Sequence, residues 1–341
     1  MNLFYSRVPF IVQVNEDPLQ IATKIELFVW EFGGIEPTTP TKVIEKTSYS
    51  PTQYIGKFNI SPYVADKTDD VNRLVNVKVL TYYKLTTTWI FIDELQYVST
   101  YGYVTNSSNL NPVKSLVNTY DKRYFRPSDF IADSFLVPKI DVVFDFDVST
   151  TLRVIYSSSL GTETIDYSGS GVELIELFLT IDNPFFIDSN TTELQYYNGV
   201  SYITYQTYNV ENICEQKFTP YVVYFINSRG GLINLTFFKK STISNDVKGT
   251  DYNLKGLKQS LNVNGISNIK LNTGWVDEDV KELIKELLLS EYIYVISSDT
   301  ITQGQAVVKT SSFVEKTGLN DKVINYEIDF EFSKPLINNY V

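Results

Sequence analysis

The chain of 341 residues contains no histidine, one cysteine and one methionine, but 25 tyrosines and 21 phenylalanines. Histidine is the commonest general base and metal ligand near neutral pH, and a single cysteine argues against zinc clusters and rules out an internal disulfide. The net charge of −11 is unfavourable for gripping nucleic acid, because phosphate contacts need clustered lysine and arginine. We therefore expect a non-enzymatic protein with no cofactor, no bound metal and no tight nucleic-acid binding.

Residues 1–100 have the pattern of short strands separated by turns. Residues 21–32 carry apolar side chains on both faces, which predicts a central strand that is covered on both sides. Further short strands follow up to about residue 98, and turn residues such as Ser61-Pro62 separate them. This spacing predicts an immunoglobulin-like β-sandwich over residues 1–100.

Residues 101–135 show no sustained period and contain two prolines, which predicts a connector or arm between two domains. Because a free linker would rarely carry so many aromatic residues, we expect this connector to be ordered by contact with another subunit. Arginine and aromatic residues are enriched at protein interfaces. The densest basic and aromatic group is therefore a candidate interface, with a solvated loop as the alternative: Lys122, Arg123, Tyr124, Phe125 and Arg126.

Strand signals resume at Lys139 and predict a β-rich domain with one helix over residues 136–341. The segment Tyr196–Tyr202 contains Asn198-Gly199, a pair that suits the two-residue type I′ turn of a β-hairpin. A second hairpin is predicted over residues 221–238, with its turn at 227–231.

One apolar stripe with helical spacing runs through residues 276–289, and three acidic residues occupy its start, where the helix dipole favours carboxylates. The predicted fold class is accordingly all-β, with two β-sandwich-like domains and a single packed helix near 276–289 in the C-terminal one. Near the C-terminus, apolar residues alternate with polar ones from residue 323 to 332. This alternation predicts a half-buried strand with an acidic face made of Glu327, Asp329 and Glu331.

The sequence offers no specific catalytic motif. A pair of carboxylates can hydrolyse a glycoside without histidine, but 40 acidic residues make some pair inevitable. Neither a phosphate-binding loop nor a nucleophile elbow is present. We also find no secretory signal and no run of about 20 apolar residues that could cross a bilayer, so we expect synthesis and folding in a cytoplasm, without a membrane.

The second half of the chain resembles virion proteins of tailed phages that infect Bacteroidetes, especially the short-tailed crAss-like group. The similarity lies in three blocks, with a weaker fourth at residues 54–64: residues 214–240, 271–291 and 323–332, which include Cys214-Glu215-Gln216-Lys217-Phe218-Thr219-Pro220, Leu271-Asn272-Thr273-Gly274-Trp275 and Val323-Ile324-Asn325-Tyr326. The resemblance implies a structural subunit of the tail or neck, present as rings of identical copies. It implies no catalytic residues.

Two functions follow as expectations. The first is a virion ring subunit that contacts copies of itself and other tail, neck or portal proteins, and that is assembled in the host bacterial cytoplasm. Its acidic face would then either line the DNA passage and repel the genome or be an outer solvated surface. The second is a tail-fibre or adhesin module that binds host-surface glycan through tyrosine rings, although the chain has no internal repeat of the kind fibres show.

Overall fold

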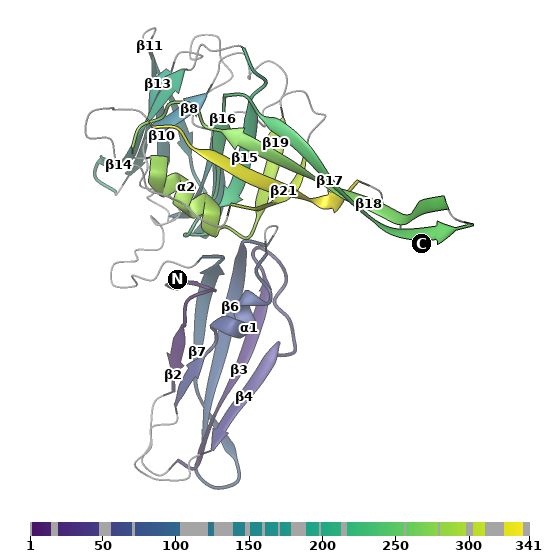
Figure 1. Ribbon diagram of the computed structural model, residues 1–341. Coiled ribbons are helices and arrows are strands. Elements are labelled where there is room, and N and C mark those ends of the chain that lie inside the picture. The colour runs from purple at the N-terminus through teal and green to yellow at the C-terminus, as the bar shows by residue number, and fades with distance from the viewer. Residues whose placement is uncertain are drawn as a thin grey trace. The chain divides into compact units, whose positions relative to one another are not determined.

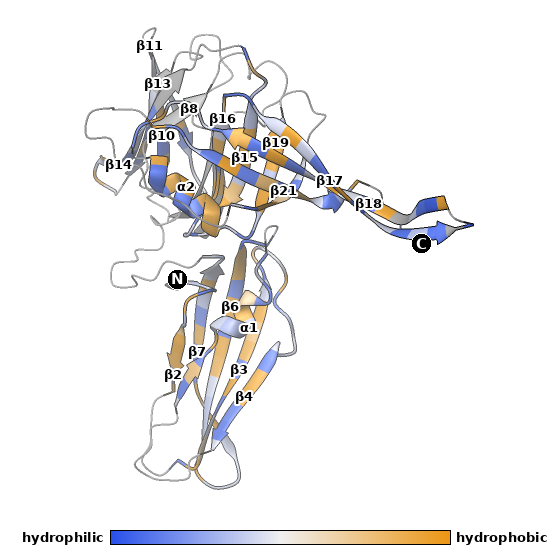
Figure 2. Ribbon diagram, viewed as in Figure 1, coloured by the Kyte–Doolittle hydropathy of each residue, from blue (hydrophilic) through white to orange (hydrophobic). Residues whose placement is uncertain are grey.

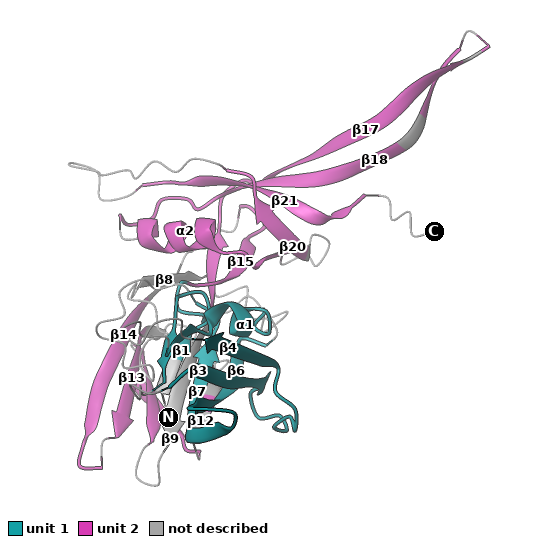
Figure 3. Cartoon of the chain, turned by 90° about the horizontal axis from the view of Figure 1, so that it is seen from below, with its two compact units in different colours: residues 1–116, 228–231 teal, residues 117–227, 232–341 magenta. Residues whose placement is uncertain are grey.

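The structure is a computed structural model (Figure 1). The residues that it describes are 2–14, 20–47, 56–69, 72–102, 122–125, 139–146, 151–158, 161–169, 171–178, 189–197, 199–212, 217–255, 257–278, 280–297, 303–310 and 324–336. Strands dominate this part of the chain, and its helices are α1 (Ser61–Ala65) and α2 (Val280–Leu289). The all-β fold class is thereby confirmed. The chain divides into unit 1, residues 1–116 with 228–231, and unit 2, residues 117–227 with 232–341 (Figure 3).

Unit 1 contains a five-stranded sheet in the order β1-β7-β6-β3-β4 and a separate two-stranded ribbon, β2-β5. β1 pairs in parallel with β7, and the remaining neighbours are antiparallel. The bounds of these strands are β1 Asn2–Tyr5, β2 Ile11–Gln13, β3 Ala22–Glu31, β4 Lys42–Thr47, β5 Lys57–Asn59, β6 Leu74–Lys84 and β7 Trp89–Thr100.

The core of unit 1 lies between one face of its sheet and a layer made by the ribbon and α1. Ile25 and Leu27 of β3 are fully buried there, together with Phe58 of β5 and Val64 of α1. Ser61-Pro62, expected only to end a strand, begins α1 instead. Proline is tolerated there because the backbone N–H groups of the first helical turn have no partner within the helix, so the missing N–H of proline costs no hydrogen bond.

On the opposite face of β3, lysine side chains cover aromatic rings in the described part of unit 1, where we expected a second apolar layer. Lys78 Nζ lies 4.7 Å from the ring centre of Phe28. Lys24 Nζ lies 4.2 Å from that of Tyr82. Lysine can do this because its stem is apolar and its charged end stays in water.

Unit 2 contains a five-stranded sheet in the order β11-β10-β13-β14-β8. The predicted β13–β14 hairpin is confirmed, but residues 198–201 separate the paired Tyr197 and Tyr202, so its loop is longer than the two-residue turn we predicted. The rings of this closing pair lie 5.1 Å apart and hold the strands together before the turn. The bounds are β8 Lys122–Phe125, β10 Leu152–Ser158, β11 Gly161–Tyr167, β13 Ser189–Tyr197 and β14 Tyr202–Asn212.

The second sheet of unit 2 has nine strands in the order β12-β9-β16-β15-β19-β20-β21-β18-β17. Every residue of β15 is buried, and its predicted hairpin with β16 is confirmed. The bounds are β9 Lys139–Phe146, β12 Gly171–Phe178, β15 Tyr221–Ile226, β16 Leu232–Phe237, β17 Thr242–Leu254, β18 Leu257–Asn272, β19 Ile293–Ser297, β20 Gln303–Val308 and β21 Glu327–Pro335.

Helix α2 buries Val280, Leu283, Ile284 and Leu287, which confirms a packed helix within the predicted range. It begins at Val280 rather than at residue 276. The reason is that Val276 forms a β-bridge with Ile324, and their backbone N–H groups donate to each other's carbonyls at 2.8 and 2.7 Å. The first residue of the apolar stripe is therefore buried by strand pairing rather than by the helix.

Two leucines of α2 give a matched test of this packing. Leu283 is 1% exposed and Leu289 is 56% exposed. We expect Leu283→Ala to lower the free energy of unfolding by about 2–5 kcal/mol, because it leaves a cavity in the core. Leu289→Ala should change it by less than about 0.5 kcal/mol. Chemical denaturation of both variants measures this, and equal losses would contradict the packing described here.

Candidate functional site

The end of the β17–β18 hairpin extends away from the nine-stranded sheet as a two-stranded ribbon (Figures 1 and 3). The hairpin is paired from Thr242 with Lys270 to Leu254 with Leu257. β18 also pairs with β21, but only from Ile266 onward. Residues 247–265, named the hairpin arm below, therefore lie beyond the last strand that supports the hairpin.

The hairpin arm is exposed to solvent over most of its length. Every side chain described from Val247 to Val263 is exposed, including four large apolar ones: Val247 at 60%, Tyr252 at 39%, Leu257 at 67% and Val263 at 38%. Figure 2 shows hydrophobic and hydrophilic segments along this ribbon. A two-stranded hairpin on its own is only marginally stable in water, because it has no second layer against which to bury apolar surface. The arm thus carries apolar surface that no second layer of the described chain covers.

The two faces of the arm differ in chemistry. The register places Tyr252 and Leu257 on one face and Asp251, Lys258 and Ser260 on the other. On the polar face, Lys258 Nζ lies 2.6 Å from Asp251 Oδ2, and the Ser260 hydroxyl donates to Asp251 Oδ1 at 2.7 Å. The hydrogen bond from Lys258 is the main cause that lowers the pKa of Asp251. The polar face is therefore satisfied within the ribbon. The face of Tyr252 and Leu257, called the apolar face below, also carries Gln259, which accepts a hydrogen bond from the Tyr252 hydroxyl at 2.7 Å, and its apolar side chains meet solvent.

The turn at the end of the arm has only two residues, Lys255 and Gly256, between the paired Leu254 and Leu257. Lys255 has φ +54°, and no other non-glycine residue in the described ranges has a positive φ. Two-residue hairpin turns need positive φ to match the twist of the strands. For a residue other than glycine, this backbone conformation costs about 1 kcal/mol. A lysine is thus held at the most projecting point of the ribbon despite a local cost.

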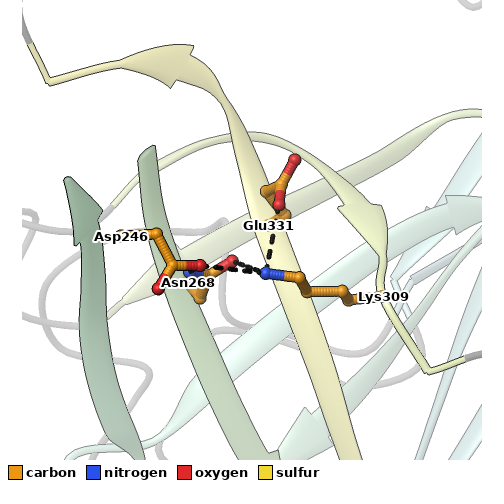
Figure 4. A network of polar contacts seen from close by, with 4 residues as sticks. All are labelled: Asp246, Asn268, Lys309 and Glu331. Atoms are coloured by element: carbon orange, nitrogen blue, oxygen red, sulfur yellow. Dashed lines mark hydrogen bonds and ion pairs between the residues drawn. The ribbon is translucent and has the colours of Figure 1, made fainter. Parts of the chain in front are cut away.

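At the base of the arm, one lysine joins four strands or their ends (Figure 4). Lys309, which follows β20, has its Nζ 3.2 Å from Asp246 of β17 and 3.3 Å from Glu331 of β21. It also donates to Asn268 Oδ1 of β18 at 2.9 Å, and Asn268 Nδ2 donates to Asp246 Oδ2 at 2.9 Å. We name these four residues the base network. It ties the root of β17 to the body of the sheet.

The ionisation of the base network follows from these contacts. The hydrogen bond from Lys309 lowers the pKa of Asp246, and the hydrogen bond to Asp246 raises the pKa of Lys309. A lowered carboxyl pKa contributes stability above the unfolded pKa, which is about 4, and this contribution is lost as the pH falls through the folded pKa. A raised lysine pKa contributes stability below the unfolded pKa, about 10, and loses it as the pH rises through the folded one. The network is therefore complete across the neutral range.

The predicted acidic face lies on β21, directly opposite donors on β18. Asn272 Nδ2 donates to Glu327 Oε1 at 3.0 Å, and Lys270 Nζ lies 3.6 Å from Asp329. Glu331 contacts Lys309 in the base network. The register itself creates this match, since it pairs Asn272, Lys270 and Asn268 with the three carboxylates in turn. Two lysines therefore offset part of the negative charge on this face.

The structure places most of the predicted basic and aromatic group in a strand. Lys122–Phe125 form β8, which pairs in parallel with residues 209–212 of β14 at the edge of the five-stranded sheet. Arg126 lies outside the described residues. We expected no regular element within residues 101–135, and for these four residues that expectation is wrong, because a four-residue edge strand is too short to show a period. The hairpin arm was not predicted as a site at all.

The described part of the chain shows neither a metal-binding cluster nor a membrane-crossing helix. No group of three or more acidic or cysteine side chains there is arranged to hold a metal ion. Neither α1 nor α2 has the length and apolar character of a membrane-crossing helix. The uncovered apolar surface of the hairpin arm, with the base network at its root, is the candidate functional site.

The base network predicts how firmly the arm is held. We expect Lys309→Met to make amide hydrogen exchange in residues 247–265 roughly two- to five-fold faster at pH 7, since exposed ion pairs contribute modestly. Lys240→Met, at an exposed lysine outside the network, is the matched control and should have no effect. In a protein that already carries Asp246→Asn, Lys309→Met should change the exchange rate of residues 247–265 much less than it does in the wild type. Equal exchange in the wild type and Lys309→Met would show that the network does not hold the arm.

Comparison of the sequence with known proteins identifies no relative. No family model matches the chain, and no curated protein is similar to it in sequence.

Proposed function

We propose that the protein is a non-enzymatic structural subunit of a phage virion that builds a tail or neck ring by self-assembly around the DNA passage. The observation that carries this proposal is the hairpin arm. It exposes Val247, Tyr252 and Leu257 on a ribbon that has no layer of its own to cover them. Such a ribbon gains stability when a partner covers it, and a subunit that works in an assembly always has that partner.

The edges of the arm support the same function. β17 is the last strand of the nine-stranded sheet, and the outer half of β18 has only β17 beside it among the described strands. An unpaired strand edge presents a row of backbone N–H and C=O groups that can pair with another chain. Natural monomers usually keep such edges short or cover them, whereas β17 is 13 residues long.

A ring also explains why one element projects so far. Identical copies that contact each other head to tail use two different surfaces, and the chain of contacts closes when the rotation per copy is right. The resemblance to crAss-like virion proteins favours the tail or neck, where the neighbours would be other tail, neck or portal proteins. The absence of histidine supports a role without catalysis.

We further propose that the acidic face of Glu327, Asp329 and Glu331 lines the DNA passage of this ring. A net charge of −11 repels phosphates, and a passage must not retain the genome. The partners Lys270 and Lys309 are held by these carboxylates and so are less available to phosphates.

The neutral variant Glu327→Gln, Asp329→Asn, Glu331→Gln tests this placement. It removes three negative charges and releases two lysines, so genome ejection from particles that carry it should slow. The matched control neutralises Glu45, Asp93 and Glu94 of unit 1 in the same way and should eject normally. Normal ejection from both kinds of particle, measured by DNA release, would place the acidic face outside the passage.

Shortening the arm tests self-assembly itself. Replacing residues 249–263 with Asn-Gly should leave a folded subunit that no longer forms rings, because it lacks the projecting ribbon while the supported part of the hairpin remains. The control deletes Val200 and Ser201 from the β13–β14 loop, which should not affect assembly. Mass photometry of both variants and of the wild type measures which oligomers each protein forms. Rings of normal size from the shortened subunit would contradict the proposal.

The alternative, a tail-fibre or adhesin module, has one observation in its favour. The outer face of the unit 1 sheet carries aromatic rings, and Phe91 there is 53% exposed. Flat rings suit sugar faces. However, Lys24 already lies over the rings of Tyr82 and Trp89, at 4.2 and 5.2 Å, so a sugar would have to displace it. A monomer or trimer that binds polysaccharide, instead of a closed ring, would favour this alternative.

A further inference from the structure

The hairpin arm is basic in an acidic protein. Residues 247–265 contain Lys248, Lys255 and Lys258 against the single acidic residue Asp251, a net charge of +2. The rest of the chain carries −13, since the whole has −11. The arm therefore differs from the body of its own subunit in both charge and exposed apolar surface. Charge complementarity of this kind selects an acidic partner surface.

A second surface of unit 2 has the complementary character. Residues 275–291, which include α2, contain six acidic residues and two lysines, a net charge of −4. Glu282 is exposed on this helix. The same segment also exposes two of the large apolar side chains of the described chain, Trp275 at 63% and Leu289 at 56%. It thus combines negative charge with uncovered apolar surface, as the arm combines positive charge with Tyr252 and Leu257.

The two surfaces lie at opposite sides of unit 2 in both Figure 1 and Figure 3. The arm cannot fold back onto the α2 of its own chain from there, because β18 holds it in line with the sheet. The paired residues from Val247 to Leu254 reach roughly 25 Å beyond the supported part of the sheet, and α2 is about 15 Å long. The arm is long enough to lie along or across the whole helix of a neighbour.

We propose that the hairpin arm of one copy docks on the α2 surface of the next copy, with Trp275 and Leu289 covered by its apolar face. This inference rests on the proposed self-assembly and names the contact that drives it. The contact is head to tail, so each copy gives one arm and receives one. Its charges are Lys248 and Lys255 on the arm and Glu278, Glu282 and Glu286 on the helix segment.

Two charge-reversed variants test the contact. The arm variant, Lys248→Glu with Lys255→Glu, changes the arm from +2 to −2. The helix variant, Glu278→Lys with Glu282→Lys and Glu286→Lys, changes residues 275–291 from −4 to +2. Each variant alone juxtaposes like charges, so its assembly at low salt should weaken at least about tenfold relative to the wild type. Circular dichroism and thermal melting establish that both remain folded.

The decisive measurement mixes the two variants in equal amounts. The reversed arm then meets a reversed helix, and the native arm of the helix variant meets the native helix of the arm variant. Rings should return in the mixture, with the two variants alternating, as native mass spectrometry can show. Two folded variants that assemble as well alone as the wild type, or that stay apart when mixed, would overturn the contact. A wild type that forms no oligomer would instead overturn the proposed function.

Discussion

Strand β18 is held along only part of its 16 residues, and the form of unit 2 follows from where that support stops. From Ile266 to Lys270 it lies between β17 and β21, inside a continuous sheet. Before Ile266, β17 is the only described strand beside it, although the Gly265 carbonyl still accepts a hydrogen bond from Leu336 N at 2.8 Å. A strand pair inherits its direction from the sheet in which it begins, so a well-packed root can carry a ribbon that has no core of its own. The base network adds polar contacts at this boundary, where Lys309 reaches both sides of it.

The sequence reveals buried elements far better than exposed ones, and unit 2 shows why. The β15–β16 hairpin and α2 were predictable because burial leaves a pattern: all of β15 is apolar or aromatic, and the buried residues of α2 follow the helical period. The arm leaves no such pattern, because every described side chain from Val247 to Val263 meets solvent. Its strands are specified by pairing with each other, which a strand-by-strand inspection does not detect.

The acidic face illustrates a related limit. The alternation along β21 correctly indicates that Glu327, Asp329 and Glu331 share one side of a strand. It cannot indicate that β18 places Asn272 opposite Glu327 and Lys270 opposite Asp329. These pairs are 55 and 59 positions apart in the chain, so only the register of the two strands makes them neighbours. For the same reason Lys309 could not be assigned to this site from the sequence. Its partners come from three different strands.

In the self-assembly proposed above, the lysines of the arm have a consequence for free subunits. A long strand edge can pair with the same edge of another molecule, which is how many β proteins aggregate. Two identical arms approach with equal positive charge at Lys248 and Lys255, so pairing between arms is repelled while other partners remain open to them. Lysine at an edge is a common natural protection against aggregation. Under the proposed self-assembly, this repulsion protects the ribbon between synthesis and incorporation, when its apolar face has nothing to cover it.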